Sequence, residues 1–272
     1  MPNHVMNRLE FDCPMERLRE ILGAICYDGG SEEAERTGIG TIDFNKIIPM
    51  PATLNIEAGS RTMVGVILYL TSQNPDAPHF GSEKMAPEAF SAFVQKIGKT
   101  YGFGSRNHNL SEEEIAKVTQ YTSAEELLEL GKTAVHNQLQ YGATTWYDWR
   151  IQPDHWNTKW NSYDPGDYDG GREITFQTAW CPPHPIIQKL SEMYPDITMR
   201  HLWADDNVGY NCGERIYKAG AVIKEFKPEP GVQAVDYACK IMGTTPADHY
   251  LQLNEDGTEY VAMDDEIHMS GM

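Results

Sequence analysis

The spacing of apolar residues predicts a first β-α-β unit at the start of the chain. Residues 3–11 alternate, which is typical of a strand with one buried face. Pro14 follows, and residues 15–25 carry apolar positions at helical spacing, so proline would stand at the helix start. Residues 39–51 alternate again and end in two prolines, which predicts a second strand. The alternating side chains are Val5, Asn7, Leu9, Phe11, Ile42 and Phe44.

Helical patterns dominate the middle of the chain. They cover residues 61–70, 87–97, 111–121 and 123–141. Two of these helices begin with a serine followed three residues later by a glutamate, the pattern of a capping box. The two pairs are Ser111 with Glu114 and Ser123 with Glu126. We read residues 54–145 as a helical insertion.

The pattern of the first unit returns after the insertion. Residues 172–180 alternate as a strand, residues 184–194 have helical spacing, and residues 197–206 alternate again. One or two further strands are expected around Gly220. A repeated strand, Cys-Pro, helix and strand is typical of the ferredoxin-like, split β-α-β arrangement. The predicted fold class is therefore α+β, with a ferredoxin-like antiparallel sheet.

The predicted organisation has four parts. Residues 1–53 and 146–223 form the two halves of the core, 54–145 the helical insertion, and 224–272 an acidic C-terminal extension. Within the extension, two alternating runs flank the turn Asn254-Glu255-Asp256-Gly257, which predicts a β-hairpin.

Charge and composition narrow the classes of partner. The 272 residues include 22 Lys and Arg against 40 Asp and Glu, a formal net charge of −18. A basic footprint for nucleic acid or for an anionic membrane is absent, so direct binding to either is not expected. The apolar runs are too short to span a bilayer, which points to a cytoplasmic protein. The five cysteines are widely spaced and read as reduced thiols rather than as metal ligands, and no cofactor or metal is predicted.

The densest chemical feature is an aromatic segment at residues 146–164, which holds four of the six tryptophans. Aromatic rings interleaved with amides and a lysine can stack a base, or form the centre of a protein interface. The competing interpretation is a buried aromatic seam. A strand-to-helix turn adds two further candidates. The candidate ligand- or partner-binding residues are Trp156, Asn157, Lys159, Trp160, Asn161, Tyr163, Thr178 and Trp180.

Catalytic and metal patterns are weaker. His201 and Asp205 would share one face of a strand, and could act as a base or hold a metal. An acidic run at 164–173 departs from the spacing of an EF-hand loop. A hydrolase would need one of these groups to converge in a pocket. The catalytic residues are therefore left unknown.

The order of several motifs resembles the YubB-type ferredoxin-like proteins of phages, plasmids and mobile elements. The motifs are PNHVMNRLEF, IDFNKIIPMP, WYDWRI…HWNTKWNSYD, FQTAWCPP with PIIQKLSEMYP, and HLWADDNVGYNCGE. The resemblance spans residues 1 to about 223. This chain has Asn157 where the family usually has glycine, and asparagine tolerates the left-handed backbone that such a turn requires.

The resemblance implies an accessory viral or mobile-element protein in the host bacterial cytosol. Such a protein would bind and inhibit a host defence or nucleic-acid-handling protein. An acidic surface would suit a basic partner. The alternatives are a binder that sequesters a nucleotide in an aromatic pocket, a hydrolase of nucleotides or nucleic acid, and a virion-associated structural protein. The oligomeric state is left open.

Overall fold

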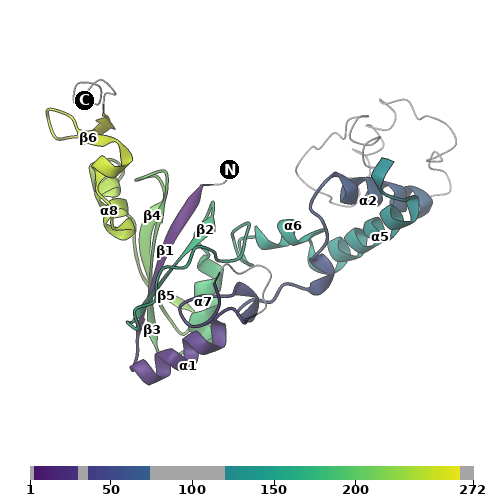
Figure 1. The fold of residues 1–272 in the computed structure, drawn as a ribbon, viewed down its shortest axis with the longest axis horizontal. Helices are drawn as coiled ribbons and strands as arrows, with labels where there is room; N and C mark the ends of the chain where they lie inside the picture. The colour runs from purple at the N-terminus through teal and green to yellow at the C-terminus, as the bar shows by residue number, and fades with distance from the viewer. Residues whose placement is uncertain (1–2, 30–35, 74–119, 264–272) are drawn as a thin grey trace. The chain divides into compact units, whose positions relative to one another are not determined.

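The computed structural model describes residues 3–29, 36–73 and 120–263 (Figure 1). The chain divides into two compact units. The first comprises Met1–Pro49 and Ile151–Met272, and the second comprises Met50–Arg150. The predicted helix at 87–97, and all but the end of that at 111–121, lie outside the described residues.

A five-stranded antiparallel sheet forms the centre of the first unit, in the order β2-β1-β3-β4-β5. Because β2 and β3 both run antiparallel to β1, they are parallel to each other with β1 between them. Helix α7 joins β2 to β3, which completes a split β-α-β unit. The predicted ferredoxin-like fold is confirmed. The elements are β1 (His4–Asp12), β2 (Glu173–Ala179), α7 (His184–Met193), β3 (Thr198–Asp205), β4 (Cys212–Lys218) and β5 (Ala221–Phe226).

The strand predicted at 39–51 is wrong. Ile39 and Thr41 form only an isolated bridge, and Phe44–Lys46 is a short 3-10 helix, η1. The side chain of Asp43 accepts a hydrogen bond from the backbone N–H of Asn45 and starts this turn. The alternating residues Ile42 and Phe44 are nevertheless fully buried. A turn thus buries the same apolar positions that a strand would bury, and periodicity does not distinguish the two.

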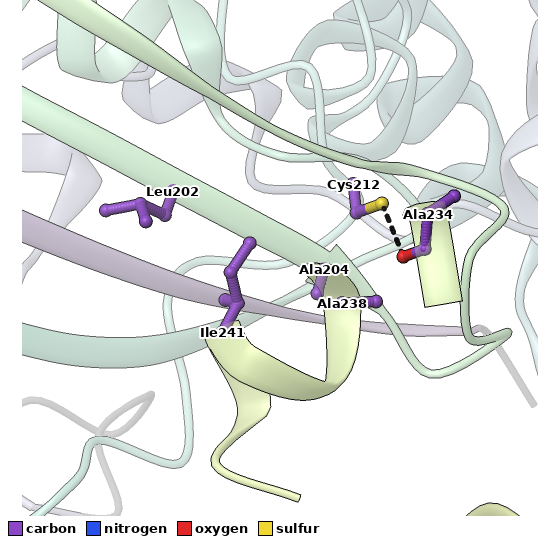
Figure 2. Packing of buried hydrophobic residues seen from close by; sticks show 6 residues of the cluster. All are labelled: Leu202, Ala204, Cys212, Ala234, Ala238 and Ile241. Atoms are coloured by element: carbon purple, nitrogen blue, oxygen red, sulfur yellow. Dashed lines mark hydrogen bonds between the residues drawn. The ribbon is translucent and has the colours of Figure 1, made fainter. Parts of the chain in front are cut away.

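Successive side chains of each strand point to opposite faces of the sheet, and apolar residues are buried on both faces. Helices α1 (Met15–Ile25) and α7 lie on one side, and α8 (Val232–Met242) lies on the other (Figure 1). On the α8 side, small residues allow the helix to approach the strands closely, and the thiol of Cys212 donates a hydrogen bond to the carbonyl of Ala234 (Figure 2). The cluster drawn there is Leu202, Ala204, Cys212, Ala234, Ala238 and Ile241.

The predicted C-terminal hairpin is confirmed. Strands β6 (Leu251–Leu253) and β7 (Tyr260–Ala262) pair after the 3-10 helix η3 (Pro246–His249). Gly257 takes the left-handed backbone that the turn requires, with φ +69°. The phenol of Tyr260 donates to the carboxylate of Asp236 on α8 at 2.7 Å, which ties the hairpin to the helix.

In its described residues, 50–73 and 120–150, the second unit contains a pair of packed helices, α2 (Ser60–Gln73) and α5 (Ala124–Tyr141). The shorter elements described there are η2 (Ala52–Leu54) and α6 (Trp146–Arg150). The capping box of Ser123 and Glu126 is confirmed at the start of α5. Helices α2 and α5 cross at Gly65 and Gly131, where a Cβ on either glycine would collide with the backbone of the other helix. Of the described helices, none has the length and apolarity needed to cross a bilayer.

Candidate functional site

The ends of three neighbouring strands meet at one end of the sheet in the first unit. Antiparallel pairing brings His4, at the start of β1, opposite Ala179, at the end of β2, and Val5 opposite Asp205, at the end of β3. Two residues of the aromatic segment reach this end: Thr158 hydrogen-bonds the backbone of Ala179, and Tyr163 forms an isolated antiparallel bridge with Gln177 of β2. The predicted site residues therefore gather at one end of the sheet, but in two different environments.

Trp156 belongs to the core. Its side chain has no exposed surface, and its indole N–H donates to the carbonyl of Ile48 at 2.9 Å. The ring of Phe44 meets it edge to face, with the centroids 5.7 Å apart. A buried tryptophan with its N–H satisfied by backbone fits the competing interpretation of an aromatic seam.

Two further predicted site residues are buried polar anchors. The Oδ1 atom of Asn161 accepts from the backbone N–H groups of Phe44 and Ser162, both at 2.9 Å. Thr178 accepts a hydrogen bond from Asn7 and donates one to the carbonyl of Cys181. These bonds occupy the side chains internally, so Asn161 and Thr178 position the backbone of the site.

Asn157 sets the turn that precedes the exposed part of the segment. Its φ of +59° is left-handed, as expected for a residue that stands in place of glycine. Its side-chain amide donates to the carbonyl of Pro182 at 3.2 Å. The turn is thereby joined to the loop between β2 and α7.

The remaining candidates, together with His4, form a partly exposed group that is here called the aromatic cluster. Its members are His4, Lys159, Trp160, Tyr163 and Trp180. The ammonium of Lys159 lies 4.9 Å from the centroid of Trp160 and 5.3 Å from that of Trp180. Tyr163 meets Trp160 edge to face at 5.8 Å, and its hydroxyl lies 2.7 Å from Nδ1 of His4. Figure 1 shows β1 and β2, which supply His4 and precede Trp180, side by side.

Trp180 is the most unusual member of the cluster. Its φ is +72°, a left-handed conformation that costs a bulky residue roughly 1–2 kcal/mol. Its backbone N–H donates to the carbonyl of Asn3 at 2.9 Å, and the preceding Ala179 exchanges two hydrogen bonds with the side chain of Thr158. These bonds hold the strained backbone while 37% of the side chain stays exposed. Strain of this kind is concentrated at functional sites.

Carboxylates surround the cluster. Asp206 accepts from the backbone N–H of His4 at 3.0 Å, and Asp205 accepts from the side chain of Asn3 at 3.1 Å. Burial first, and then the charges of Asp206 and Asp164, raise the pKa of the Tyr163 phenol. Burial is also the main cause that raises the pKa of Asp205. The potential at Tyr163 is therefore negative, which suits a cationic ligand better than an anionic one.

Sequence reasoning missed His4 and Asp206 as members of this end of the sheet. Both lie in motifs quoted for the family resemblance, but neither motif indicates that the two residues meet, because they are 202 positions apart in the sequence. The usable signal is strand pairing: once β1 is placed between β2 and β3, the start of β1 must meet the ends of both.

The predicted base, His201, does not join a pocket with Asp205. His201 is fully buried on the α7 side of the sheet, where its Nε2 lies 3.0 Å from Oδ1 of Asn7. Burial first, and then the charges of His184 and Arg215, lower its pKa well below the usual range. Asp205 instead accepts from Asn3 and Asn207. The two side chains have separate polar partners.

The acidic run at 164–173 does not form a metal centre in the described structure. Its carboxylates have different partners: Asp164 with Gln177, Asp167 with Arg36, Asp169 with the N–H of Gly171, and Glu173 with Arg8. Across residues 3–29, 36–73 and 120–263, no group of three potential ligands is placed to hold a metal ion.

A hollow elsewhere in the first unit is lined by Glu10, Arg172 and Arg200. Its charges are satisfied by neighbours, since Arg200 contacts both Glu10 and Glu214, and Arg8 contacts Glu173 at 2.8 Å. Paired charges of this kind leave little for a ligand to neutralise. The aromatic cluster is therefore the stronger candidate site.

A family model that matches part of the chain agrees with the ferredoxin-like fold. Residues 155–245 match a family model described as the ferredoxin-like domain in Api92-like protein. The chain is also similar to the crystal structure of a protein api92 from Yersinia pseudotuberculosis, with 12% identity and a TM-score of 0.35, over 85% of this chain and 99% of that one. No curated protein matched the chain. The matched family is Api92-like, and the finer YubB-type resemblance remains a prediction.

Proposed function

We propose that the chain is a binding module, rather than an enzyme, and that it engages a protein partner through the aromatic cluster. The observation that carries this proposal is Trp180, which is held in a strained left-handed backbone with 37% of its side chain exposed. The carbonyl of Asn3, and the side chain of Thr158 through Ala179, keep this backbone in place. Rigid, partly exposed tryptophan and tyrosine rings are the residues that dominate binding energy at protein interfaces.

The charge of the chain favours a basic partner. The formal net charge is −18, and two carboxylates act on Tyr163 within the site itself. Complementary charge accelerates association and makes it sensitive to salt. A basic host protein, such as an enzyme with a nucleic-acid-binding surface, fits this chemistry. The resemblance to accessory proteins of phages and mobile elements supports the further proposal that binding inhibits a host defence or nucleic-acid-handling protein in the bacterial cytosol.

Sequestration of a nucleotide is the second candidate. The specific observation in its favour is that Lys159 stands beside the exposed indole of Trp180, so that a base could stack while the lysine meets a phosphate. The carboxylates Asp164 and Asp206 oppose it, because their charge acts at the same cluster and repels a phosphate. We therefore place the protein partner first.

Affinity purification from bacterial host cells tests the proposal when it compares three forms of the tagged, full-length chain. The wild type should retain a stoichiometric basic protein, and Trp180→Ala should lose it. Tyr121→Ala removes another exposed aromatic side chain, in the second unit, from a residue that is 76% exposed, and this variant should retain the partner. Raising the salt concentration should weaken the complex.

Two outcomes would count against this function. Retention of the same partner by Trp180→Ala would exclude the aromatic cluster as the interface. A nucleotide that co-purifies with the wild type, raises its melting temperature and fails to do so with Trp180→Ala would instead establish the second candidate.

A further inference from the structure

Lys159 has an unusual environment for a partly exposed lysine. Its ammonium lies within 5.3 Å of the centroids of two tryptophan rings, Trp160 and Trp180. Both distances fall inside the ~6 Å limit for a cation–π contact. Among the described residues no carboxylate forms an ion pair with Lys159, whereas Lys46 and Lys189 each contact one at 2.8 Å. Although the chain is acidic, the contacts of the Lys159 ammonium are with the two tryptophan rings.

We infer that the indoles of Trp160 and Trp180 form a receptor for a cationic side chain of the partner, and that Lys159 occupies this receptor in the unbound protein. The inference rests on the proposed function for the identity of the partner, but not for the chemistry of the receptor. The class of ligand is an arginine guanidinium or a lysine ammonium, methylated or not.

The electrostatics of the cluster support a cation in this place. The faces of the indole rings carry the negative part of the ring quadrupole. The charges of Asp164 and Asp206 reach Tyr163, which in turn packs on Trp160. Ring faces and nearby carboxylates together form the environment in which proteins bind organic cations.

Exchange of Lys159 for an incoming cation costs little. Its side chain is only partly buried, and a cation–π contact at such a site is weak and reversible. An arginine from the partner would bind better than Lys159, because a planar guanidinium stacks on an aromatic face and sheds water more easily than an ammonium does. The four-carbon stem of lysine allows the ammonium to swing into water without any change in the backbone.

The receptor can be tested without knowledge of the partner. The probes are Nα-acetylarginine amide and tetramethylammonium, and the readout is the indole N–H resonances of Trp160 and Trp180 in the full-length chain, assigned with the Trp160→Phe and Trp180→Phe variants. Lys159→Met removes the competing ammonium and retains the length of the side chain. It should bind either probe about fivefold more tightly than the wild type, as expected from the loss of one weak cation–π competitor.

Lys189→Met is the matched control, because Lys189 is an exposed lysine on α7 that pairs with Glu192. It should bind the probes as the wild type does. Equal affinity of Lys159→Met and the wild type would overturn the inference, as would probe binding that leaves both indole resonances unmoved.

The inference and the proposed function fail in different ways. If the probes bind as expected but no protein partner depends on Trp180, the receptor stands and the proposed function fails. If a partner depends on Trp180 but Lys159→Met binds it more weakly, with no binding of the probes, Lys159 is itself a contact to the partner and the inference fails.

Discussion

Trp156 and Trp160 stand four residues apart and have opposite roles. Trp156 is fully buried, and its indole N–H is satisfied by the backbone of Ile48. Trp160 is only partly buried, and its neighbours are Lys159 and the partly buried Tyr163. The difference arises from segments that are far away in the sequence. The residue type therefore does not define the role of either tryptophan; the residues that pack around each ring define it.

Substitution of the buried Trp156 should lower the free energy of unfolding more than substitution of Trp160. Trp156→Ala removes a fully enclosed side chain and leaves the carbonyl of Ile48 without its donor, so we expect a loss of about 3–5 kcal/mol in the free energy of unfolding. Trp160→Ala should cost clearly less, because part of that ring is already in water. Urea denaturation of both variants provides the measurement. Equal losses would mean that the two tryptophans are equivalent parts of the core.

Patterns that repeat over many residues were the predictable part of the fold. The alternation of β1, the helical spacing of α1 and α7, the capping box at Ser123 and the C-terminal hairpin all appear where periodicity and turn chemistry placed them. The strand predicted at 39–51 was wrong because a capped turn at Asp43 buries Ile42 and Phe44 equally well. Local patterning cannot represent the hydrogen bond that Asn161 accepts from the N–H of Phe44, a residue 117 positions away.

The sequence predicted which residues belong to the candidate site, but not how they are arranged. The aromatic segment was identified from its residues, yet which members are anchors and which are exposed depends on long-range pairing. The motifs that contain His4 and Asp206 do not show that these residues meet, and only the register of β1 with β2 and β3 brings them to the cluster. The left-handed turn at Asn157 is the exception, because the resembling family has glycine at this position and asparagine tolerates the same backbone.

Two histidines in the interior of the first unit, His184 and His201, should make the stability of the protein sensitive to acid. Burial, with smaller contributions from the charges of Arg215 and Lys227, lowers the pKa of His184 to about 3, and the pKa of His201 is also well below its usual range. An unfolded imidazole titrates near ~6.5. Below that pH the unfolded chain takes up protons that the folded chain does not, so stability is full above pH ~6.5 and falls as the pH decreases toward about 3.

Each such histidine contributes a slope of about 1.4 kcal/mol per pH unit within this window. Urea denaturation at a series of pH values gives the slope. His184→Gln should reduce it, because glutamine can still hydrogen-bond Tyr217 but does not titrate in this range. His136→Gln, on the exposed surface of α5, should leave the slope unchanged. An unchanged slope in His184→Gln would show that His184 does not stay neutral in the folded chain.

The smallest effect on stability is expected on the exposed side, at Trp180. Trp180→Gly loses the contacts of a partly exposed indole but relieves a left-handed backbone that costs roughly 1–2 kcal/mol, so the net change in the free energy of unfolding should be below about 1 kcal/mol. Trp180→Ala loses the same contacts and retains the strain, so it should be less stable than Trp180→Gly by about 1 kcal/mol. Both variants should lose the partner equally. Equal stability of Trp180→Ala and Trp180→Gly would mean that the backbone at Trp180 is not strained. The argument that this strain is kept because Trp180 binds a partner would then fail.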